Sequence, residues 1–353
     1  MDDGRHIAPE LGLLAGEGSQ QRIGTPDEAF PSKSFVWRDL PSHSFDEAEP
    51  TYYGRPVLKE PVWVWSVPLY FYVGGTAGAA AVLAAAAQGL DGDDLHGLVK
   101  TCRWVAAVGG AAGSALLVYD LGRPERFLNM LRVFRPTSAM SLGSWVLAGA
   151  ASATMGSAVL AERQGVLGRL GHLAGYAAAL LGMPLAGYTA VLLGNTAVPV
   201  WSTTRRSLPP LFIGSAVSGL ASLFGLLPVD LERREERIVE RFGAIGKVAD
   251  LAAMAVVEHE AERVEPVGRA LKEGLPGALW NAAKGLTGAS LALFLLPGGG
   301  RARRLAGGLL GTAGALALRF AVFHAGKASA RDPQATFRRQ RQETGAALSA
   351  KDR

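Results

Sequence analysis

Residues 62–88, VWVWSVPLYFYVGGTAGAAAVLAAAAQ, form an apolar stretch without a charged side chain. A helix needs about 20 consecutive apolar residues to cross the hydrocarbon core of a bilayer, and this stretch exceeds that length. Its glycines and alanines are the small residues that allow membrane helices to approach closely, where lipid provides no hydrophobic drive for their association. The stretch therefore predicts a membrane-spanning helix.

Seven further segments continue this pattern along the chain. They lie at about 102–120, 138–161, 170–194, 209–228, 241–260, 276–297 and 303–326. The fifth begins with Pro209 and Pro210, which helices tolerate in their first turn. We predict an all-α, polytopic membrane helix bundle of about eight transmembrane helices in two four-helix groups.

The overall composition supports a membrane protein and excludes other classes. Of the 353 residues, 49% are hydrophobic and 19% charged, and the mean hydropathy is +0.18, which is more apolar surface than one soluble core needs. The net charge of +5 does not indicate nucleic-acid binding, because the basic residues lie in short segments between apolar runs. Cys102 is the only cysteine, so the chain has neither an internal disulfide nor the ligands of an iron-sulfur cluster.

The two ends of the chain are polar. Residues 1–60 contain many turn formers and lack the layout of a cleaved signal peptide, so we expect a partly extended tail. The bundle then occupies residues 61–327, and a second polar tail occupies 328–353. Arginines after the second segment and in the C-terminal tail favour cytoplasmic termini in an inner (plasma) membrane, although basic residues at 301–304 oppose this orientation.

Charged residues interrupt the last three segments. The sixth contains Lys247, Asp250 and Glu258, which are costly on a helix that faces lipid. They indicate either a proton path or buried pairing, or a helix at the membrane interface with solvated side chains, and we prefer the solvated interpretation. Lys284 and Arg319, in the last two segments, should face protein or water.

Residues 119–145, YDLGRPERFLNMLRVFRPTSAMSLGSW, are polar and rich in arginine. Asp120 enters this stretch at a membrane boundary, with Arg123 and Arg126 close behind. A partly desolvated carboxylate beside cations is a setting that can pass protons. The alternative is an ion-paired helix cap that anchors the chain at the cytoplasmic surface.

Within this stretch, DLGRPERF (120–127) and LRVFRPTSAMSLGSW (131–145) are similar to the NrfD/PsrC-type membrane subunits of polysulfide reductase. Three other segments resemble the same family. They are WVWSVPLYFYVGGTAG (63–78), YTAVLLGNTAVPVWSTTRRSLPPLF (188–212) and AGKASARDPQATF (325–337). The resemblance covers about residues 52–340.

This resemblance implies an eight-helix subunit without haem that binds menaquinone or ubiquinone near one membrane face. It also implies a ferredoxin-like iron-sulfur subunit alongside, attached to a molybdopterin-type catalytic subunit. Electrons would pass between the quinone and the cluster, so the chain is not expected to be catalytic alone.

The resemblance also implies where the quinone headgroup lies. The family's asparagine and histidine of the first helix fall on Val67 and Tyr70, and its further tyrosine falls on Tyr188. A tyrosine hydroxyl can still donate a hydrogen bond to a quinone carbonyl, although it relays protons less well than histidine. Tyr70 is therefore the first candidate, and Asp120 is expected to transfer the protons. The remaining members of the predicted site are Ser141, Trp145, Arg123 and Arg126.

Other interpretations stay open or are excluded on simple grounds. Both tyrosines could instead be packed aromatics whose hydroxyls bond the backbone. The six histidines show no pairing for haem and no ligand spacing for a metal. Two other classes compete with the quinone subunit: a transporter or ion channel using Asp120, Lys284 and Arg319, and a redox-inactive membrane anchor.

Overall fold

The structure is a computed structural model that describes residues 57–91, 94–121, 123–296 and 300–337, with two short strands near the N-terminus. These strands, β1 (His6–Ala8) and β2 (Leu13–Ala15), pair in antiparallel fashion. They belong to a unit separate from the helices. The rest of the predicted N-terminal tail up to residue 56, and the C-terminal tail beyond residue 337, lie outside the described residues.

The described helical region has eight long helices at the eight predicted positions. They are α1 (Ser66–Asp91), α2 (His96–Asp120), α3 (Ala139–Leu160), α4 (Val166–Gly194), α6 (Leu208–Leu226), α7 (Arg233–Glu262), α9 (Gly274–Leu295) and α10 (Arg301–Arg331). Three short helices lie in the connections: η3 (Pro124–Leu131), α5 (Pro199–Thr203) and α8 (Glu265–Lys272). The predicted all-α fold is confirmed.

Six of the long helices are long and apolar enough to cross a membrane: α1, α2, α3, α4, α6 and α10. The prediction of about eight spans is therefore approximate. Helix α7 begins with a run of charged residues, and α9 carries Asn281 and Lys284, so neither is apolar enough over its length. Both pack beside the spanning helices α6 and α10. The protein is a multi-pass membrane protein.

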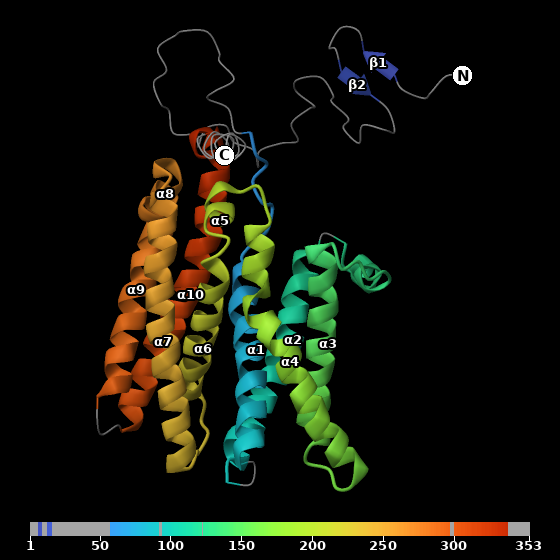
Figure 1. Cartoon of the computed structure of the whole chain (residues 1–353), viewed down its shortest axis with the longest axis vertical. Coiled ribbons are helices and arrows are strands. Elements are labelled where there is room, and N and C mark those ends of the chain that lie inside the picture. Colours follow the sequence, from blue (N-terminus) through green and yellow to red (C-terminus); the bar gives the residue numbers. More distant parts are fainter. Residues whose placement is uncertain are drawn as a thin grey trace, which may run out of the picture. The chain divides into compact units, whose positions relative to one another are not determined.

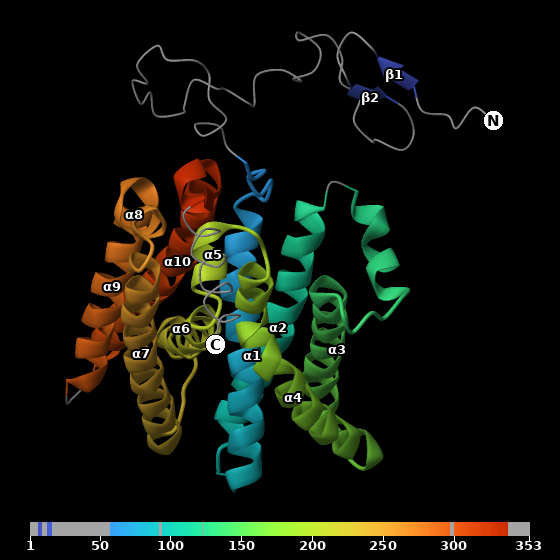
Figure 2. The ribbon, with the colours of Figure 1, turned by 45° about the horizontal axis from the view of Figure 1, so that its top comes forward.

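The helices form two groups of four, as predicted (Figures 1 and 2). Helices α1 to α4 make the first group, and α6, α7, α9 and α10 make the second. The groups meet where α1 and α4 contact α6 and where α1 contacts α10. Helices α1, α6 and α9 begin, and α10 ends, at the end of the bundle that carries α8, here called the α8 end (Figure 1).

Glycines bring helix backbones into direct contact within each group. A Cβ atom on Gly78 of α1 would lie 2.5 Å from the carbonyl oxygen of Gly182 in α4. In the second group, a Cβ on Gly225 of α6 would lie 2.6 Å from the carbonyl oxygen of Arg304 in α10. Gly78, the last residue of GGTAG (74–78), thus serves helix packing, as expected for small residues in membrane helices.

One buried carboxylate joins the two groups at the end opposite α8. Glu235 of α7 is 2% exposed. One of its oxygens accepts a hydrogen bond from the Leu98 backbone in the first turn of α2, at 2.6 Å, and the other accepts from the Glu232 backbone at 2.9 Å. A single side chain thus satisfies backbone donors at the start of both helices, which otherwise lack partners.

At the α8 end, the segment before α1 is bound to the end of α10. Glu60 pairs with Arg331 in a bidentate manner, at 2.7 and 3.1 Å, and Trp63 stacks on Trp201 with ring centroids 5.9 Å apart. The first and last helices therefore have their outer termini at the same end of the bundle.

The glycine contact between α1 and α4 can be tested directly. Gly78→Ala should lower the free energy of unfolding by about 1–3 kcal/mol, because a methyl group has no room at the crossing. Thermal unfolding of the purified protein in mild detergent measures this change.

Gly285→Ala in α9 is the matched control, since a Cβ there would meet no atom within 4 Å. Alanine favours a helix over glycine by up to about 1 kcal/mol, so the control should keep or raise the melting temperature. Equal losses in both variants would contradict the direct contact.

Candidate functional site

Two of the predicted site residues, Tyr70 and Tyr188, are buried inside the first helix group. Tyr70 of α1 is 6% exposed, and Tyr188 of α4 is 8% exposed. The Tyr70 ring packs on α2, where a Cβ on Gly113 would lie 3.2 Å from its Cδ2 atom. Tyr70 also belongs to the same apolar cluster as Leu185, which lies three residues before Tyr188 on α4. The fold thus brings together two aromatic hydroxyls that are 118 positions apart in the sequence.

Gly143 of α3 makes the space that Tyr188 occupies. The Tyr188 ring lies against the backbone of Gly143, and a Cβ there would lie 2.9 Å from the hydroxyl oxygen. This oxygen is buried and has no hydrogen bond of good geometry to a described atom. An unsatisfied buried hydroxyl costs about 1–3 kcal/mol, so a ligand that supplied an acceptor here would gain binding free energy.

Val67 lies on the apolar side of this site. It is 5% exposed and belongs to the same hydrophobic cluster as Tyr70, Leu147 of α3 and Leu185 of α4. At the position where the resemblance implies a polar residue, this protein therefore presents a branched apolar side chain to the interior of the helix group.

Asp120 caps the start of α1 from the end of α2. Its Oδ1 atom accepts hydrogen bonds from the Val64 backbone at 3.1 Å and from the Ser66 hydroxyl at 3.2 Å. Ser66 lies one helical turn before Tyr70, so the carboxylate stands next to the tyrosine site along α1. The helix-cap interpretation agrees with this geometry. Asp120 is also partly exposed, so a proton can still reach it from water.

Of the other four predicted residues, Arg123 and Arg126 lie on the connection between α2 and α3, and Ser141 and Trp145 lie in the first two turns of α3. Arg123 is exposed just before η3, and Arg126 lies within η3. The Ser141 hydroxyl donates to the Val133 carbonyl at 3.2 Å and accepts from the Arg135 backbone at 3.0 Å.

Trp145 lies one turn after Ser141 on α3. It is 40% exposed and meets the edge of Phe134, with ring centroids 6.0 Å apart. Gly143, between Ser141 and Trp145, is the α3 residue that faces Tyr188, and our sequence analysis did not single it out. A glycine in an apolar helix was the only signal for it.

The preferred interpretation of the sixth segment was wrong. Lys247 and Asp250 do not face the bulk solvent: both are 0% exposed, because α7 packs that face against α6. Glu258 is partly buried and pairs with Lys284 at 3.0 Å. Arg319 is 1% exposed inside the second group, so both cations of the last two helices face protein, as predicted.

Among the residues that the structure describes, no three His, Cys, Asp or Glu side chains gather as a metal site requires. The arrangement that remains is a polar, tyrosine-containing site enclosed by the first four helices of a multi-pass membrane protein.

Comparison with known proteins identifies the family of this protein. Residues 56–329 match the family model described as "Polysulphide reductase, NrfD". The match covers most of the sequence, so the protein belongs to this family, and the resemblance in the sequence motifs is confirmed.

A curated relative from Wolinella succinogenes, the C subunit of polysulfide reductase, is 29% identical to this protein over 85 residues. These residues are 23% of this protein and 27% of the relative. The alignment thus spans about a quarter of the length of the relative.

Two substitutions at Asp120 distinguish the contribution of its capping oxygen from the contribution of its negative charge. Asp120→Ala removes the acceptor and should lower the free energy of unfolding by about 0.5–2 kcal/mol, the usual loss for a helix cap. Asp120→Asn keeps a side-chain oxygen in the same place and should lose much less. Thermal unfolding in detergent compares the two variants. Equal losses would show that the charge, and not the capping oxygen, stabilises this end of α1.

Proposed function

We propose that this protein is the quinone-binding membrane subunit of a multi-subunit oxidoreductase, passing electrons between the quinone pool and an iron-sulfur partner. The observation that supports this most is the buried pair of tyrosines, Tyr70 and Tyr188, of which the Tyr188 hydroxyl lies against the Gly143 backbone and donates no hydrogen bond to a described acceptor. In this member of the NrfD family, Asp120 accepts a hydrogen bond from Ser66, one helical turn before Tyr70.

The site has the groups that quinone chemistry needs. Oxidation of a quinol to a quinone releases two electrons and two protons, and reduction takes up the same numbers. The tyrosine hydroxyls would donate hydrogen bonds to the quinone carbonyl oxygens and hold the ring. Val67 and its apolar neighbours would pack on the ring and its tail. Asp120, partly exposed, would exchange the protons with water.

The electrons must leave or enter through another protein. Cys102 is the only cysteine, so an iron-sulfur cluster would belong to a ferredoxin-like partner, attached in turn to a molybdopterin-type catalytic subunit. The family and the name of the relative support a complex of this type. We place the complex in the inner (plasma) membrane, with a bundle of residues 61–327, polar tails on either side and both termini in the cytoplasm.

Two observations support other roles for the same protein. Val67 and Tyr70 lie within an apolar cluster, which also suits a membrane anchor that no longer binds quinone. The buried charges of the second helix group also suit a transporter. An anchor predicts the redox partner without quinone, and a transporter predicts neither.

Purification in mild detergent, followed by identification of bound quinone and of co-purifying subunits, tests the proposal. We expect menaquinone or ubiquinone together with a protein that contains iron and sulfide, and no haem bands in the visible spectrum. A stable protein that carries no quinone even when quinone is added would contradict the proposal.

Tyr70→Phe and Tyr188→Phe test the site itself. Each variant should weaken quinone binding roughly two- to tenfold, the loss of one hydrogen bond worth about 0.5–1.5 kcal/mol. Quinone titration monitored by tryptophan fluorescence measures the change. Tyr119→Phe is the matched control, because Tyr119 is 66% exposed on α2. Unchanged binding in both site variants would show that the quinone does not bind at this pair of tyrosines.

A further inference from the structure

The second helix group holds three ionisable side chains in its interior. Lys247 and Asp250 of α7 are 0% exposed, and Arg319 of α10 is 1% exposed. A charge inside the membrane region costs several kcal/mol unless it is paired or hydrated. The hydrogen-bond and ion-pair partners of these three side chains therefore show whether each one serves stability or function.

The two cations are held by the protein. Lys247 Nζ donates to the Ser222 hydroxyl at 2.9 Å and to the Ser218 carbonyl at 3.3 Å, and it lies 4.0 Å above the Phe294 ring. Arg319 Nη2 donates to the Phe212 carbonyl at 2.9 Å, and the guanidinium stacks on the Phe212 ring at 3.9 Å. Neither cation forms an ion pair with a described carboxylate.

The Asp250 carboxylate has no such partner. Both of its oxygens are buried, and neither accepts a hydrogen bond from a described atom. Arg319 and Lys247 act on it electrostatically without direct contact. The same region contains further buried atoms without a hydrogen bond to a described atom: Ser215 Oγ, Ser218 Oγ, and Arg319 Nε and Nη1. The hydroxyls of Tyr72 in α1 and Thr312 in α10 lie close to each other in the same region.

So many unpaired polar atoms in one place are unusual, because most buried polar atoms in proteins have a partner. They line neighbouring helices: Gly219 of α6, one residue after Ser218, lies against Tyr72 of α1, with an ideal Cβ 3.1 Å from its ring. Buried water is the usual partner of such groups. A metal cation suits the place poorly, because Lys247 and Arg319 both flank the carboxylate.

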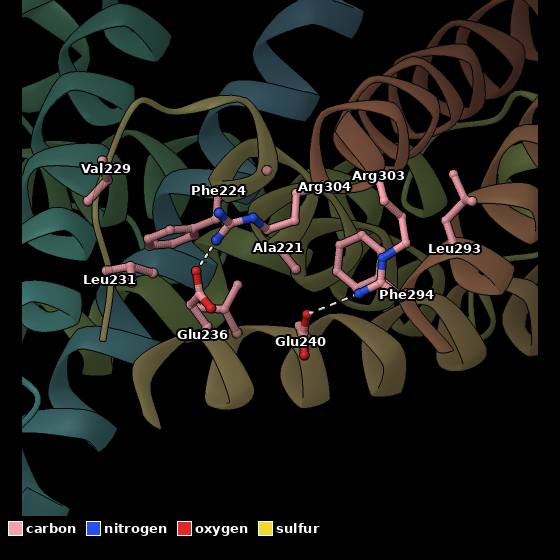
Figure 3. Close-up of a pocket in the computed structure, with 12 residues that line it drawn as sticks. Ala221, Phe224, Val229, Leu231, Glu236, Glu240, Leu293, Phe294, Arg303 and Arg304 are labelled. Atoms are coloured by element: carbon pink, nitrogen blue, oxygen red, sulfur yellow. Dashed lines mark hydrogen bonds and ion pairs between the residues drawn. The ribbon is translucent and has the colours of Figure 1, made fainter. Parts of the chain in front are cut away.

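A pocket lies at the end of the second helix group opposite α8 (Figure 3). It lies between the ends of α6, α7, α9 and α10, with apolar walls that include Phe224, Leu231 and Phe294. Two ion pairs cross it, Arg304 with Glu236 and Arg303 with Glu240 at 3.9 Å.

Phe294 stands between the pocket and Lys247. Its ring is held between Gly243 of α7 and Gly307 of α10, where ideal Cβ atoms would lie 2.9 and 3.1 Å from ring carbons. It lines the pocket while it also contacts the Lys247 ammonium.

We propose that Asp250 is the proton acceptor of an internal hydrated site, reached by protons from this pocket past Phe294 and Lys247. A proton from water adds to the Asp250 carboxylate and leaves again as the carboxylate re-forms. With Lys247 and Arg319 charged, the group of three changes from a net charge of +1 to +2 and back. Among the residues that the structure describes, Tyr72 of α1 is a further titratable side chain near Arg319 in this region. The site is separate from the tyrosine site and does not require quinone.

Cysteine accessibility tests the water path. Ser222→Cys, Ser218→Cys and Ser215→Cys differ from the native side chains by one atom and follow the same face of α6. In membrane vesicles, each should react with a charged methanethiosulfonate at least about tenfold faster than buried Cys102, because only a hydrated sulfur forms the reactive thiolate. Phe294→Ala should speed the reaction at Ser222→Cys further. Folded variants that all react as slowly as Cys102 would overturn the path.

A second experiment uses the unaltered protein. Dicyclohexylcarbodiimide, an apolar reagent that adds to protonated carboxyl groups, should modify Asp250, and the yield should fall as the pH rises. Mass spectrometry of the peptide measures the adduct, which Asp250→Asn must remove. No adduct at any pH at which the protein stays folded would overturn the assignment of Asp250. Because neither experiment involves quinone, the proton site and the quinone proposal can fail separately.

Discussion

The fold depends on helix backbones that touch at glycines. Lipid offers helices no hydrophobic reason to associate, so association depends on close packing, and close packing needs small residues at the crossings. The α1–α4 crossing at Gly78 and the α6–α10 crossing at Gly225 supply this within the two groups. The same principle makes the site, since Gly113 and Gly143 leave the space that Tyr70 and Tyr188 fill.

Polar groups inside the bundle are of two kinds: those whose hydrogen bonds the protein supplies and those whose hydrogen bonds it does not. Groups of the second kind indicate where a functional site lies. Glu235 and Lys247 have their hydrogen bonds supplied by the protein, so they stabilise the arrangement of helices. Tyr188 and Asp250 do not. Natural structures rarely leave buried polar atoms unpaired unless water, a ligand or a catalytic role accounts for them. Tyr188 lies in the first helix group and Asp250 in the second, which favours two distinct sites over one continuous site.

The eight helices could be predicted because apolar length is a local property of the sequence. Their ends could not, because the ends depend on distant partners: α2 begins at His96, six residues before the predicted start, where Glu235 accepts a hydrogen bond from Leu98. Lys247 and Asp250 were misplaced for the same reason, since α6, α9 and α10 supply the surfaces that bury them. Tyr70 and Tyr188 were predicted only through the family resemblance, and their proximity required the fold.

The shared cap of Glu235 also bears on how the protein is made. Its two partners, Leu98 and Glu232, belong to different helix groups, and the bond to Leu98 joins residues 137 positions apart. During synthesis the N-terminal part of a protein emerges first. The first four helices therefore enter the membrane while the start of α2 still lacks this acceptor, and that end stays incomplete until α7 has been translated. The first helix group is therefore completed by a residue of the second group. A truncated protein that ends after α6 would contain every residue of the tyrosine site, but it would lack the Glu235 carboxylate that caps the start of α2.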